Sequence, residues 1–444
     1  MKVLVVGGGG REHALVWKLA RSPLVEAIYC APGNPGTARL AHNLEVSPGS
    51  VHELAEAAEQ EGIDLTVVGP ELSLGLGIAD EFERRGLTLF GPGQAAARIE
   101  TSKVFAKQFM ARHGIPTAEF SVHEDSREAR RTLEERQIFP VVVKADGLAA
   151  GKGVTVAGTR QQALKAVEKI MVEKRFGAAG ERVVIEEFLE GREVSFFALT
   201  DGTRLQTLPT CRDYKAALDG DRGPNTGGMG AFSPSADSDE ALSQEIVEKI
   251  LRPTIDGMAR EGYPYRGVLF AGLILTDDGP RVLEFNARFG DPETQVLLPR
   301  LESDLAPLLL ACARGELTET PAEWSPEVSV CVVLASRGYP DSPEVGVPID
   351  GIPPSGEIPG VEIFHAGTRT GADGVLLTGS GRVLNVVARG INLEEARGTA
   401  YRAIASISFP GMQFREDIAR TTESAEPAVP PSIEENKRNA EETN

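Results

Sequence analysis

Three polar residues alternate along an otherwise apolar stretch around residue 285. Glu284, Asn286 and Arg288 stand at every second position, and in a β-strand this spacing directs all three side chains to one face. A carboxylate and an amide oxygen suit Mg²⁺, which takes its remaining ligands from water and phosphate. An ordinary half-exposed strand would explain the alternation, but not why every outward residue is an oxygen donor or an arginine. The pattern therefore predicts a metal site formed by Glu284 and Asn286.

A second set of residues is suited to binding phosphate. Lys144 ends an apolar run, and Lys152 lies in the glycine-rich segment 147–153. Both cations could converge on a polyphosphate while the glycines allow the backbone to close over it. The segment is not a Walker A loop, because its glycines are one residue too close together and Gly153 replaces the Ser or Thr that binds magnesium. A lysine at a solvated strand end is the alternative, but the pairing with a flexible loop favours phosphate binding.

Four consecutive glycines, at positions 7–10, follow the first apolar run. Backbone N–H groups ahead of a helix N-terminus form an anion site. A dinucleotide site is disfavoured, because Glu12 stands where the third glycine of that motif belongs and the second strand ends in Cys30 rather than an acid. A tight turn without a ligand remains an alternative.

Two further segments carry weaker signals. Residues 182–195 combine an apolar strand with several acids, and such an edge can offer backbone groups to a purine and a carboxylate to a ribose. An edge strand with a charged exit explains that segment equally well. The other segment is a glycine-rich loop at 225–230, preceded by Arg212, Asp213 and Lys215.

The elements that must position these residues begin with an alternating β-α pattern. Apolar runs at 2–6, 27–30, 65–68 and 87–90 predict strands, each followed by Gly or Pro, with a helix at 13–20. Such alternation implies a parallel, doubly wound sheet, whose ligands bind beyond the carboxyl ends of the strands. Further strands are predicted at 141–143, 183–185, 268–275, 281–285, 328–334 and 383–387, and helices at 102–113 and 393–406.

The bulk properties bound the class of protein. The 444 residues suffice for about three domains of roughly 150 residues each. A formal net charge of −19 argues against general nucleic-acid binding, which requires a basic face. The apolar runs are far shorter than the roughly 20 residues that cross a membrane, and the N-terminus lacks the apolar core of a signal peptide. The four cysteines form no C-x-x-C pair, so we expect buried thiols in a cytoplasmic protein that binds neither nucleic acid nor membrane.

Six sequence blocks, in order along the chain, resemble one known family. They are Gly-Gly-Gly-Arg-Glu-His at 8–13, Pro-Gly-Asn at 32–34, Gly-Pro-Glu at 69–71, Lys-Ala-Asp-Gly-Leu-Ala-Ala-Gly-Lys-Gly-Val at 144–154, Gly-Pro-Asn-Thr-Gly-Gly-Met-Gly at 223–230 and Arg-Phe-Gly-Asp-Pro-Glu-Thr-Gln at 288–295. Together they resemble the phosphoribosylamine–glycine ligases of the ATP-grasp superfamily, over residues 1–420. The resemblance implies ATP-dependent joining of glycine to 5-phosphoribosylamine through glycyl phosphate, in de novo purine biosynthesis, with Mg²⁺ or Mn²⁺ as cofactor.

The resemblance also implies an α/β protein with several parts. An N-terminal doubly wound (pre-ATP-grasp) domain is expected at 1–102, an ATP-grasp domain at 103–324 with a mobile lid at 119–193, and a small C-terminal α+β domain at 325–420. Residues 421–444, acidic and rich in proline, are expected to be disordered. We expect a monomer whose partners are the small molecules ATP, glycine and phosphoribosylamine.

By the same resemblance, residues acquire roles. The residues expected to bind ATP are Lys103, Lys144, Gly151, Lys152, Gly153, Glu186, Glu187, Phe188, Leu189 and Glu193. The residues expected to bind glycine or phosphoribosylamine are Gly9, Gly10, Asn34, Glu71, Asp213, Lys215, Arg288, Gly290, Asp291 and Glu293. Glu284 and Asn286 match the family's metal ligands, and Lys144, Asp213 and Arg288 are expected to act in catalysis.

The chain departs from the family pattern at Ser73, Tyr214 and Ala216. Because Asp213 and Lys215 remain, we expect activity to persist. Two rivals are disfavoured. The blocks at 223–230 and 288–295 argue against an ATP-grasp ligase for another carboxylate, and the intact metal pair and Lys144 argue against a catalytically silent nucleotide-binding regulator.

Overall fold

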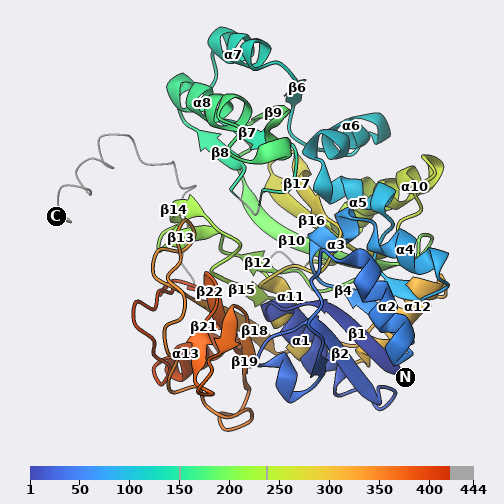
Figure 1. Ribbon diagram of the computed structural model, residues 1–444. Helices are drawn as coiled ribbons and strands as arrows, with labels where there is room; N and C mark the ends of the chain where they lie inside the picture. The colour runs from blue at the N-terminus through green and yellow to red at the C-terminus, as the bar shows by residue number, and fades with distance from the viewer. Residues whose placement is uncertain (150–151, 237–238, 421–444) are drawn as a thin grey trace.

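The computed structural model describes residues 1–149, 152–236 and 239–420. The predicted acidic tail at 421–444 therefore lies outside the described residues. The described part has mixed α/β architecture, with one parallel sheet and several antiparallel sheets (Figure 1).

The N-terminal region is a five-stranded parallel sheet with the order β3-β2-β1-β4-β5. Its strands are β1 (Lys2–Gly7), β2 (Ala27–Pro32), β3 (His42–Asn43), β4 (Leu65–Val68) and β5 (Leu89–Phe90). Its helices are α1 (Gly10–Leu19), α2 (Val51–Glu61), α3 (Glu71–Gly75), α4 (Ile78–Arg84) and α5 (Gln94–Thr101), with a 3₁₀ turn at Thr37–Arg39.

Both faces of this sheet are covered. Val3 and Val5 pack with residues of α1, whereas Leu4 and Val6 pack with residues of α2. A strand that is buried on both faces consists of a continuous run of apolar residues. The run at 2–6 is of this kind, so the strand could be predicted from the sequence. The doubly wound arrangement is thus confirmed. Strand β3 was not predicted, because it has only two residues and both are exposed and polar.

The middle of the chain forms two four-stranded antiparallel sheets. The first has the order β6-β9-β7-β8 and contains β6 (Phe120–His123), β7 (Val141–Ala145), β8 (Val154–Ala157) and β9 (Val183–Glu187). We call it the lid sheet because it falls within the lid expected at 119–193, and the mobility of this lid stays a prediction. The lid helices are α7 (Ser126–Glu135) and α8 (Arg160–Val167), followed by a π-helical turn (Glu168–Val172) and a 3₁₀ turn (Gly177–Gly180). Figure 1 shows the lid projecting from the rest of the molecule, with α7 and α8 on its outer side.

The body sheet has the order β11-β10-β16-β17. Its strands are β10 (Arg192–Thr200), β11 (Leu205–Thr207), β16 (Gly267–Thr276) and β17 (Gly279–Asn286). The neighbouring helices are α6 (Lys103–His113), α9 (Glu240–Ile246), a π-helical turn (Val247–Leu251) and α10 (Arg252–Arg260). The long strands at 268–275 and 281–285 and the helix at 102–113 are confirmed.

The last part of the chain builds a five-stranded sheet in the order β12-β15-β18-β22-β19. Its strands are β12 (Arg212–Asp213), β15 (Gly230–Ser233), β18 (Val328–Ala335), β19 (Val361–His365) and β22 (Arg382–Gly390). Two hairpins accompany it, β13 (Ala216–Leu218) with β14 (Arg222–Asn225) and β20 (Thr368–Thr370) with β21 (Leu376–Thr378). The remaining helices are α11 (Glu293–Leu297), a 3₁₀ turn (Leu298–Arg300), α12 (Leu305–Arg314) and α13 (Leu393–Ile404).

This sheet spans the predicted boundary at residue 324, because β15 pairs with β18 along four residues of each. The C-terminal strands are therefore continuous with the segment that carries Asp213. The predicted boundaries themselves stay a proposal.

Two general expectations can be compared with the described residues. All four cysteines are buried and free, as expected. No helix in the described ranges is long and apolar enough to cross a membrane.

Candidate active site

A cleft of about 2110 Å³ lies between the lid sheet and the body sheet. Small-molecule sites usually measure roughly 300–1,000 Å³, so this cleft has room for a nucleotide and a second substrate together. Its walls come from all regions, including Glu71 of the N-terminal region, Lys144 of the lid and Arg382 of the C-terminal sheet. The predicted site residues that line it are Glu71, Lys103, Lys144, Lys152, Gly153, Glu186, Glu187, Phe188, Leu189, Glu193, Asp213, Lys215, Glu284, Asn286, Arg288, Asp291 and Glu293.

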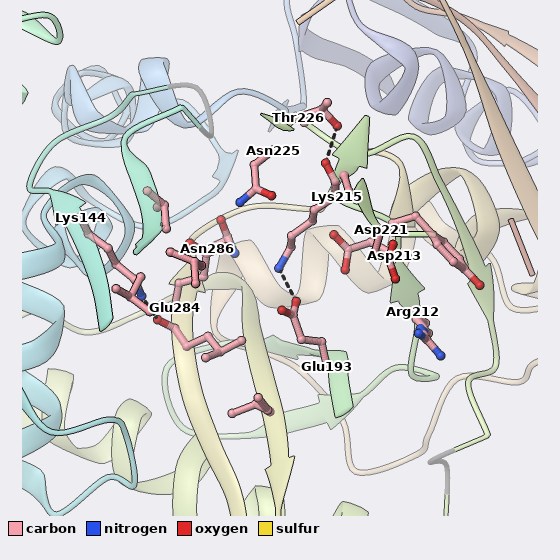
Figure 2. Close-up of a pocket in the computed structure, with 18 of the residues that line it drawn as sticks. Lys144, Glu193, Arg212, Asp213, Lys215, Asp221, Asn225, Thr226, Glu284 and Asn286 are labelled. Atoms are coloured by element: carbon pink, nitrogen blue, oxygen red, sulfur yellow. Dashed lines mark hydrogen bonds and ion pairs between the residues drawn. The ribbon is translucent and has the colours of Figure 1, made fainter. Parts of the chain in front are cut away.

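Strand β17 presents the predicted metal pair to the cleft. Glu284 and Asn286 both line it, and Phe285 between them is buried in the core (Figure 2). The alternation predicted from the sequence is therefore present. The pairing of β17 with β16 shifts register beside Glu284, and such irregularities commonly re-aim side chains at active sites.

The charge state of Glu284 suits a cation. Burial works to raise the pKa of its carboxyl group, but the charges of Lys215, Lys144 and Lys103 outweigh burial, so the pKa lies below its usual value. An ionised carboxylate and an amide oxygen on one rigid strand fit Mg²⁺. Within the described residues, no three His, Cys, Asp or Glu side chains gather to hold a metal ion by themselves. The protein thus offers part of a coordination shell, which phosphate and water would complete.

Helix α6 carries two lysines into the cleft. Ser102 caps its N-terminus by accepting a hydrogen bond from the Phe105 N–H at 3.1 Å, and Gly114, with a φ of 66°, ends it. Lys103 and Lys107 are four residues apart and therefore project from the same face. Both line the cleft.

Glu186, on β9, forms ion pairs with two lysines that line the cleft. Its Oε2 lies 3.0 Å from the Nζ of Lys107 and 3.0 Å from the Nζ of Lys144. Its Oε1 is buried and has no hydrogen-bond partner among the described residues. Lys144 also donates to the Leu283 carbonyl at 3.1 Å, which ties the lid to β17. Burial lowers the pKa of Lys107 to about 8, although the charge of Glu186 works in the opposite direction.

The glycine-rich segment of the lid contacts the C-terminal region. Lys152 Nζ donates a hydrogen bond of 2.8 Å to the carbonyl oxygen of Pro340. Lys152 and Gly153 both line the cleft. Phosphate binding by these two residues stays a prediction. Gly151 lies outside the described residues.

The segment predicted to hold adenine and ribose forms another wall. Glu187, Phe188 and Leu189 all line the cleft, and Glu187 Oε1 accepts a hydrogen bond from the Glu119 N–H at 2.9 Å. Glu193, at the start of β10, forms an ion pair of 2.9 Å with the Nζ of Lys215 (Figure 2).

The opposite end of the cleft is rich in carboxyl groups. Burial raises the pKa of Glu293 to about 7, and the nearby charge of Asp213 adds to the effect. Burial also raises the pKa of Asp213, although the charge of Lys215 works to lower it. Because the two carboxyl groups interact, a proton held here belongs to the pair rather than to either residue.

Arg288 is oriented by two carboxylates. Its Nε lies 3.3 Å from Glu71 Oε2, and its Nη2 lies 2.9 Å from Glu100 Oε1 and donates to Asn286 Oδ1 at 3.2 Å. Glu100 also accepts the Ala287 N–H at 2.7 Å. Burial raises the pKa of Glu100 to about 7, while the charge of Arg288 works to lower it. Arg288 therefore has a fixed direction along the cleft.

Three residues predicted to bind phosphoribosylamine do not line the cleft, namely Gly9, Gly10 and Asn34. The Gly9 N–H donates to Glu12 Oε2 at 2.6 Å, so a carboxylate of the chain already occupies the predicted anion position. Asn34 is buried, and its side chain bonds to backbone groups, including the His365 carbonyl at 2.9 Å. Gly290 also lies outside the cleft lining. The roles assigned to these residues stay predictions.

The three departures from the family pattern have local partners. Ser73 Oγ donates to the Pro48 carbonyl at 2.6 Å. Tyr214 lines the cleft, and its hydroxyl accepts the Ala419 N–H at 3.0 Å. Ala216 also lines the cleft.

The residues that line the cleft but were not predicted include Lys107, Glu100, Tyr339 and Arg382. For Lys107 the sequence carried a signal, since a lysine four residues after Lys103 in a predicted helix shares its face. The other three are brought to the cleft by packing between distant segments, which no local pattern reveals.

Fold and site together define a class of protein. A lid sheet carrying Lys144 faces a body sheet carrying the Glu284 carboxylate and the Asn286 amide, beside a parallel-sheet region, which is the arrangement of an ATP-grasp ligase. Residues 1–100, 101–294 and 329–421 match the N domain, the ATP-grasp (A) domain and the C domain described for phosphoribosylglycinamide synthetase. The chain belongs to this family, whose members are also named phosphoribosylamine–glycine ligase. Enzymes of the ATP-grasp class use ATP and divalent metal ions.

Individual relatives are similar over nearly the whole chain. A phosphoribosylamine–glycine ligase of Caldanaerobacter subterraneus subsp. tengcongensis is 49% identical over 419 residues, covering 94% of this chain and 99% of that protein. The trifunctional purine biosynthetic protein adenosine-3 of Gallus gallus is 48% identical over 420 residues, which are 94% of this chain and 42% of that protein. The crystal structure of a phosphoribosylamine–glycine ligase from Thermotoga maritima has 37% identity and a TM-score of 0.83, covering 94% of this chain and all of that one.

Proposed function

We propose that this protein catalyses the ATP-dependent ligation of glycine to 5-phosphoribosylamine, giving glycinamide ribonucleotide, ADP and phosphate within purine biosynthesis. The observation that carries the proposal is the single cleft in which the lysines of α6 and β7 face Glu284 and Asn286, with Arg288, Asp213 and Glu293 beyond them. The similarity to named ligases over 94% of the chain supports the choice of substrates.

The lysine end of the cleft would hold ATP. Lys103 and Lys144 would contact the phosphates, and residues 147–153 would cover them. The wall at 186–189 would hold adenine, and Glu193 the ribose. A buried, unpartnered carboxylate oxygen such as Glu186 Oε1 requires a donor, which a bound purine amine would supply.

Glu284 and Asn286 would hold the divalent ion, Mg²⁺ or Mn²⁺. When bound, the ion supplies positive charge that neutralises the phosphate oxygens during phosphoryl transfer.

The carboxyl-rich end would bind the other two substrates. Asp213 and the 290–293 turn suit the ammonium group of glycine, and the positive charge of Arg288 suits its carboxylate. Glu71 lines the cleft beside Arg288 and would contact phosphoribosylamine, for which Gly9, Gly10 and Asn34 are also proposed.

The proposed chemistry needs no protein nucleophile. A glycine carboxylate oxygen attacks the γ-phosphorus of ATP, the bond to the β,γ-bridging oxygen breaks, and ADP leaves. The phosphoribosylamine nitrogen then attacks the glycyl carbonyl carbon, a C–N bond forms, phosphate leaves, and the nitrogen loses a proton. Because the acyl phosphate hydrolyses readily, a closed lid that excludes water would protect it.

One assay tests the proposal. The protein is incubated with ATP, Mg²⁺, glycine and freshly prepared phosphoribosylamine, and ADP release is followed. We expect turnover that requires all components. ADP release that continues without glycine, or none at all, would exclude the proposed activity.

Three further proposals accompany this function. The protein acts in the cytoplasm, as a monomer, with domains at 1–102, 103–324 and 325–420 and a lid at 119–193. Sedimentation of the purified protein tests the monomeric state, and a mass of twice 47.4 kDa would contradict it.

A further inference from the structure

Arg382, the first residue of β22, reaches out of the C-terminal sheet into the cleft. Its Nη1 donates to the carbonyl oxygens of Gly227 at 2.6 Å and Asp291 at 2.8 Å. The same nitrogen lies 3.3 Å from Asp291 Oδ1. One guanidinium group therefore joins two loops that are separated by more than sixty residues in the sequence.

The two loops touch at Gly228, which leaves no room for a side chain, and Gly227 lies close against Arg382. A Cβ at Gly227 would lie 3.1 Å from the Arg382 Cζ, so the guanidinium lies against the bare backbone. Gly228 has a φ of 110°, and a Cβ there would lie 2.5 Å from the Pro292 ring. The glycine-rich sequence of the 226–228 loop is thus explained by close packing against Arg382 and the 291–293 turn.

A second C-terminal residue holds the same loop. The Gly227 N–H donates to the hydroxyl oxygen of Tyr339 at 3.0 Å. Both polar backbone groups of Gly227 are therefore bonded to side chains from the C-terminal part of the chain.

The 226–228 loop is in turn hydrogen-bonded to Lys215, a residue predicted to bind substrate. The N–H and the Oγ1 of Thr226 both donate to the Lys215 carbonyl, at 2.8 and 2.9 Å (Figure 2). Lys215 lines the carboxyl-rich end with Asp213. On the other side, Asp291 is two residues from Glu293. Contacts of Arg382 thus lead to both sides of the proposed glycine site.

The ionic contact is favourable in its surroundings. Burial works to raise the pKa of the Asp291 carboxyl group, but the charges of Arg382 and Arg11 outweigh it, and the pKa lies below its usual value. Asp291 therefore remains ionised beside the guanidinium. An arginine suits this place because its planar fork can serve several acceptors at once, which a lysine cannot do.

We propose that Arg382 is a positioning residue for the ligation: it holds the 226–228 loop against the 291–293 turn and so sets the shape of the glycine-binding end. The proposal rests on the proposed function for the identity of the substrate. Tyr339 assists through its contact with Gly227, and neither residue touches the reacting atoms.

The test compares Arg382→Gln with Arg389→Gln. Arg389 lies on the same strand, and its half-exposed ion pair with Glu327 is remote from the loops. In Arg382→Gln we expect the KM for glycine to rise roughly 10- to 100-fold, as for loss of charge-assisted hydrogen bonds. The KM for ATP should stay within about twofold of wild type. Arg389→Gln should match wild type in both, and Arg382→Lys should lie between.

Amide hydrogen exchange supplies a readout independent of turnover. Exchange at 225–230 and 289–294 should accelerate in Arg382→Gln but not in Arg389→Gln. Tyr339→Phe, which removes one acceptor and no bulk, should accelerate exchange at 225–230 and raise the glycine KM less. It keeps the test valid if Arg382→Gln does not fold.

The outcomes separate the two proposals. If the wild type releases no ADP, the proposed function falls. If the wild type is active but Arg382→Gln resembles Arg389→Gln in glycine KM and in exchange, only the role of Arg382 falls. Equal rises in the KM values for glycine and ATP would also overturn that role, because they would indicate general loosening of the cleft.

Discussion

The two ends of the cleft differ in which buried groups have shifted pKa values. At the end proposed to bind ATP, Lys107 and Lys144 form ion pairs with Glu186, and Lys103 also lines the cleft. Burial lowers the pKa of Lys107 to about 8, and burial also lowers the pKa of Lys103. Here cations are crowded and partly deprived of water.

At the substrate end the crowded groups are carboxyls. Burial raises the pKa of Glu293 to about 7 and also raises that of Asp213. A polyphosphate would bring negative charge to the lysines, and the amino group of glycine would bring positive charge to the carboxyl pair. Shifted pKa values of this kind are typical of binding sites. The shifted groups are lysines at one end and carboxyl groups at the other, which distinguishes the two ends of the cleft.

The largest effect is expected where the two ends meet, at Glu284. Lysines from both ends, Lys144 and Lys215, act on its carboxyl group. Glu284→Gln removes the charge without changing the shape, and we expect kcat to fall by at least about 100-fold, as when a group that stabilises the transition state is lost. Steady-state kinetics measures this, with the melting temperature as a check on folding. Asp278→Asn, in the turn of the same hairpin, is the matched control, and near-normal activity of Glu284→Gln would refute the metal role.

A smaller effect is expected at the ATP end from Lys107→Met. Without Lys107, Glu186 has only Lys144 as a cationic partner, so Lys144 is less available to phosphate. We expect the KM for ATP to rise roughly 10-fold while the KM for glycine is unchanged. In the wild type, the KM for ATP should also rise above about pH 8, as Lys107 loses its proton. The exposed Lys165→Met serves as control, and a glycine KM that rises equally would contradict the separation of the two ends.

The smallest effect is expected in stability at the substrate end, from Glu293→Gln. The pKa of Glu293 is about 7 in the folded protein against 4.5 when unperturbed, so its proton favours the folded state at low pH, and this contribution is lost as pH rises through 7. The unfolding free energy of the ligand-free wild type should therefore fall relative to Glu293→Gln between pH 5 and 7, by at most about 1.4 kcal/mol per pH unit. Urea unfolding across this range measures it. Parallel curves for the two proteins would show that the carboxyl pair is not strained.

The sequence predicted those parts of the molecule that depend on local pattern. Apolar runs ended by glycine or proline predicted the strands, and the alternation at 284–288 predicted that Glu284 and Asn286 share one face of β17. Their role in metal binding stays a prediction. At the predicted anion loop, the Glu12 carboxylate accepts a hydrogen bond from the Gly9 N–H, and anion binding there stays a prediction. The sequence displays Glu12, but the direction of its side chain depends on the turn.

The remainder depends on long-range packing. Glu100 forms an ion pair with Arg288, which is almost two hundred residues away in the sequence. Arg382 donates a hydrogen bond to Gly227, which is more than one hundred and fifty residues away. Glu100 and Arg382 lie in no sequence motif, so no spacing rule could place them at the cleft. Three-dimensional structure was required to see that the C-terminal strands form part of the site.

The hydrogen bond from Lys152 to Pro340 joins the lid to the C-terminal region through a main-chain oxygen. Because every amino acid supplies that oxygen, mutation at position 340 can change the side chain and still leave the acceptor in place. The contact therefore depends on the identity of a side chain only at the donor, residue 152. Over evolutionary time the turn at residue 340 is therefore free to vary in sequence so long as its path is kept, whereas the lid must retain a long cationic side chain at residue 152 for the contact to survive.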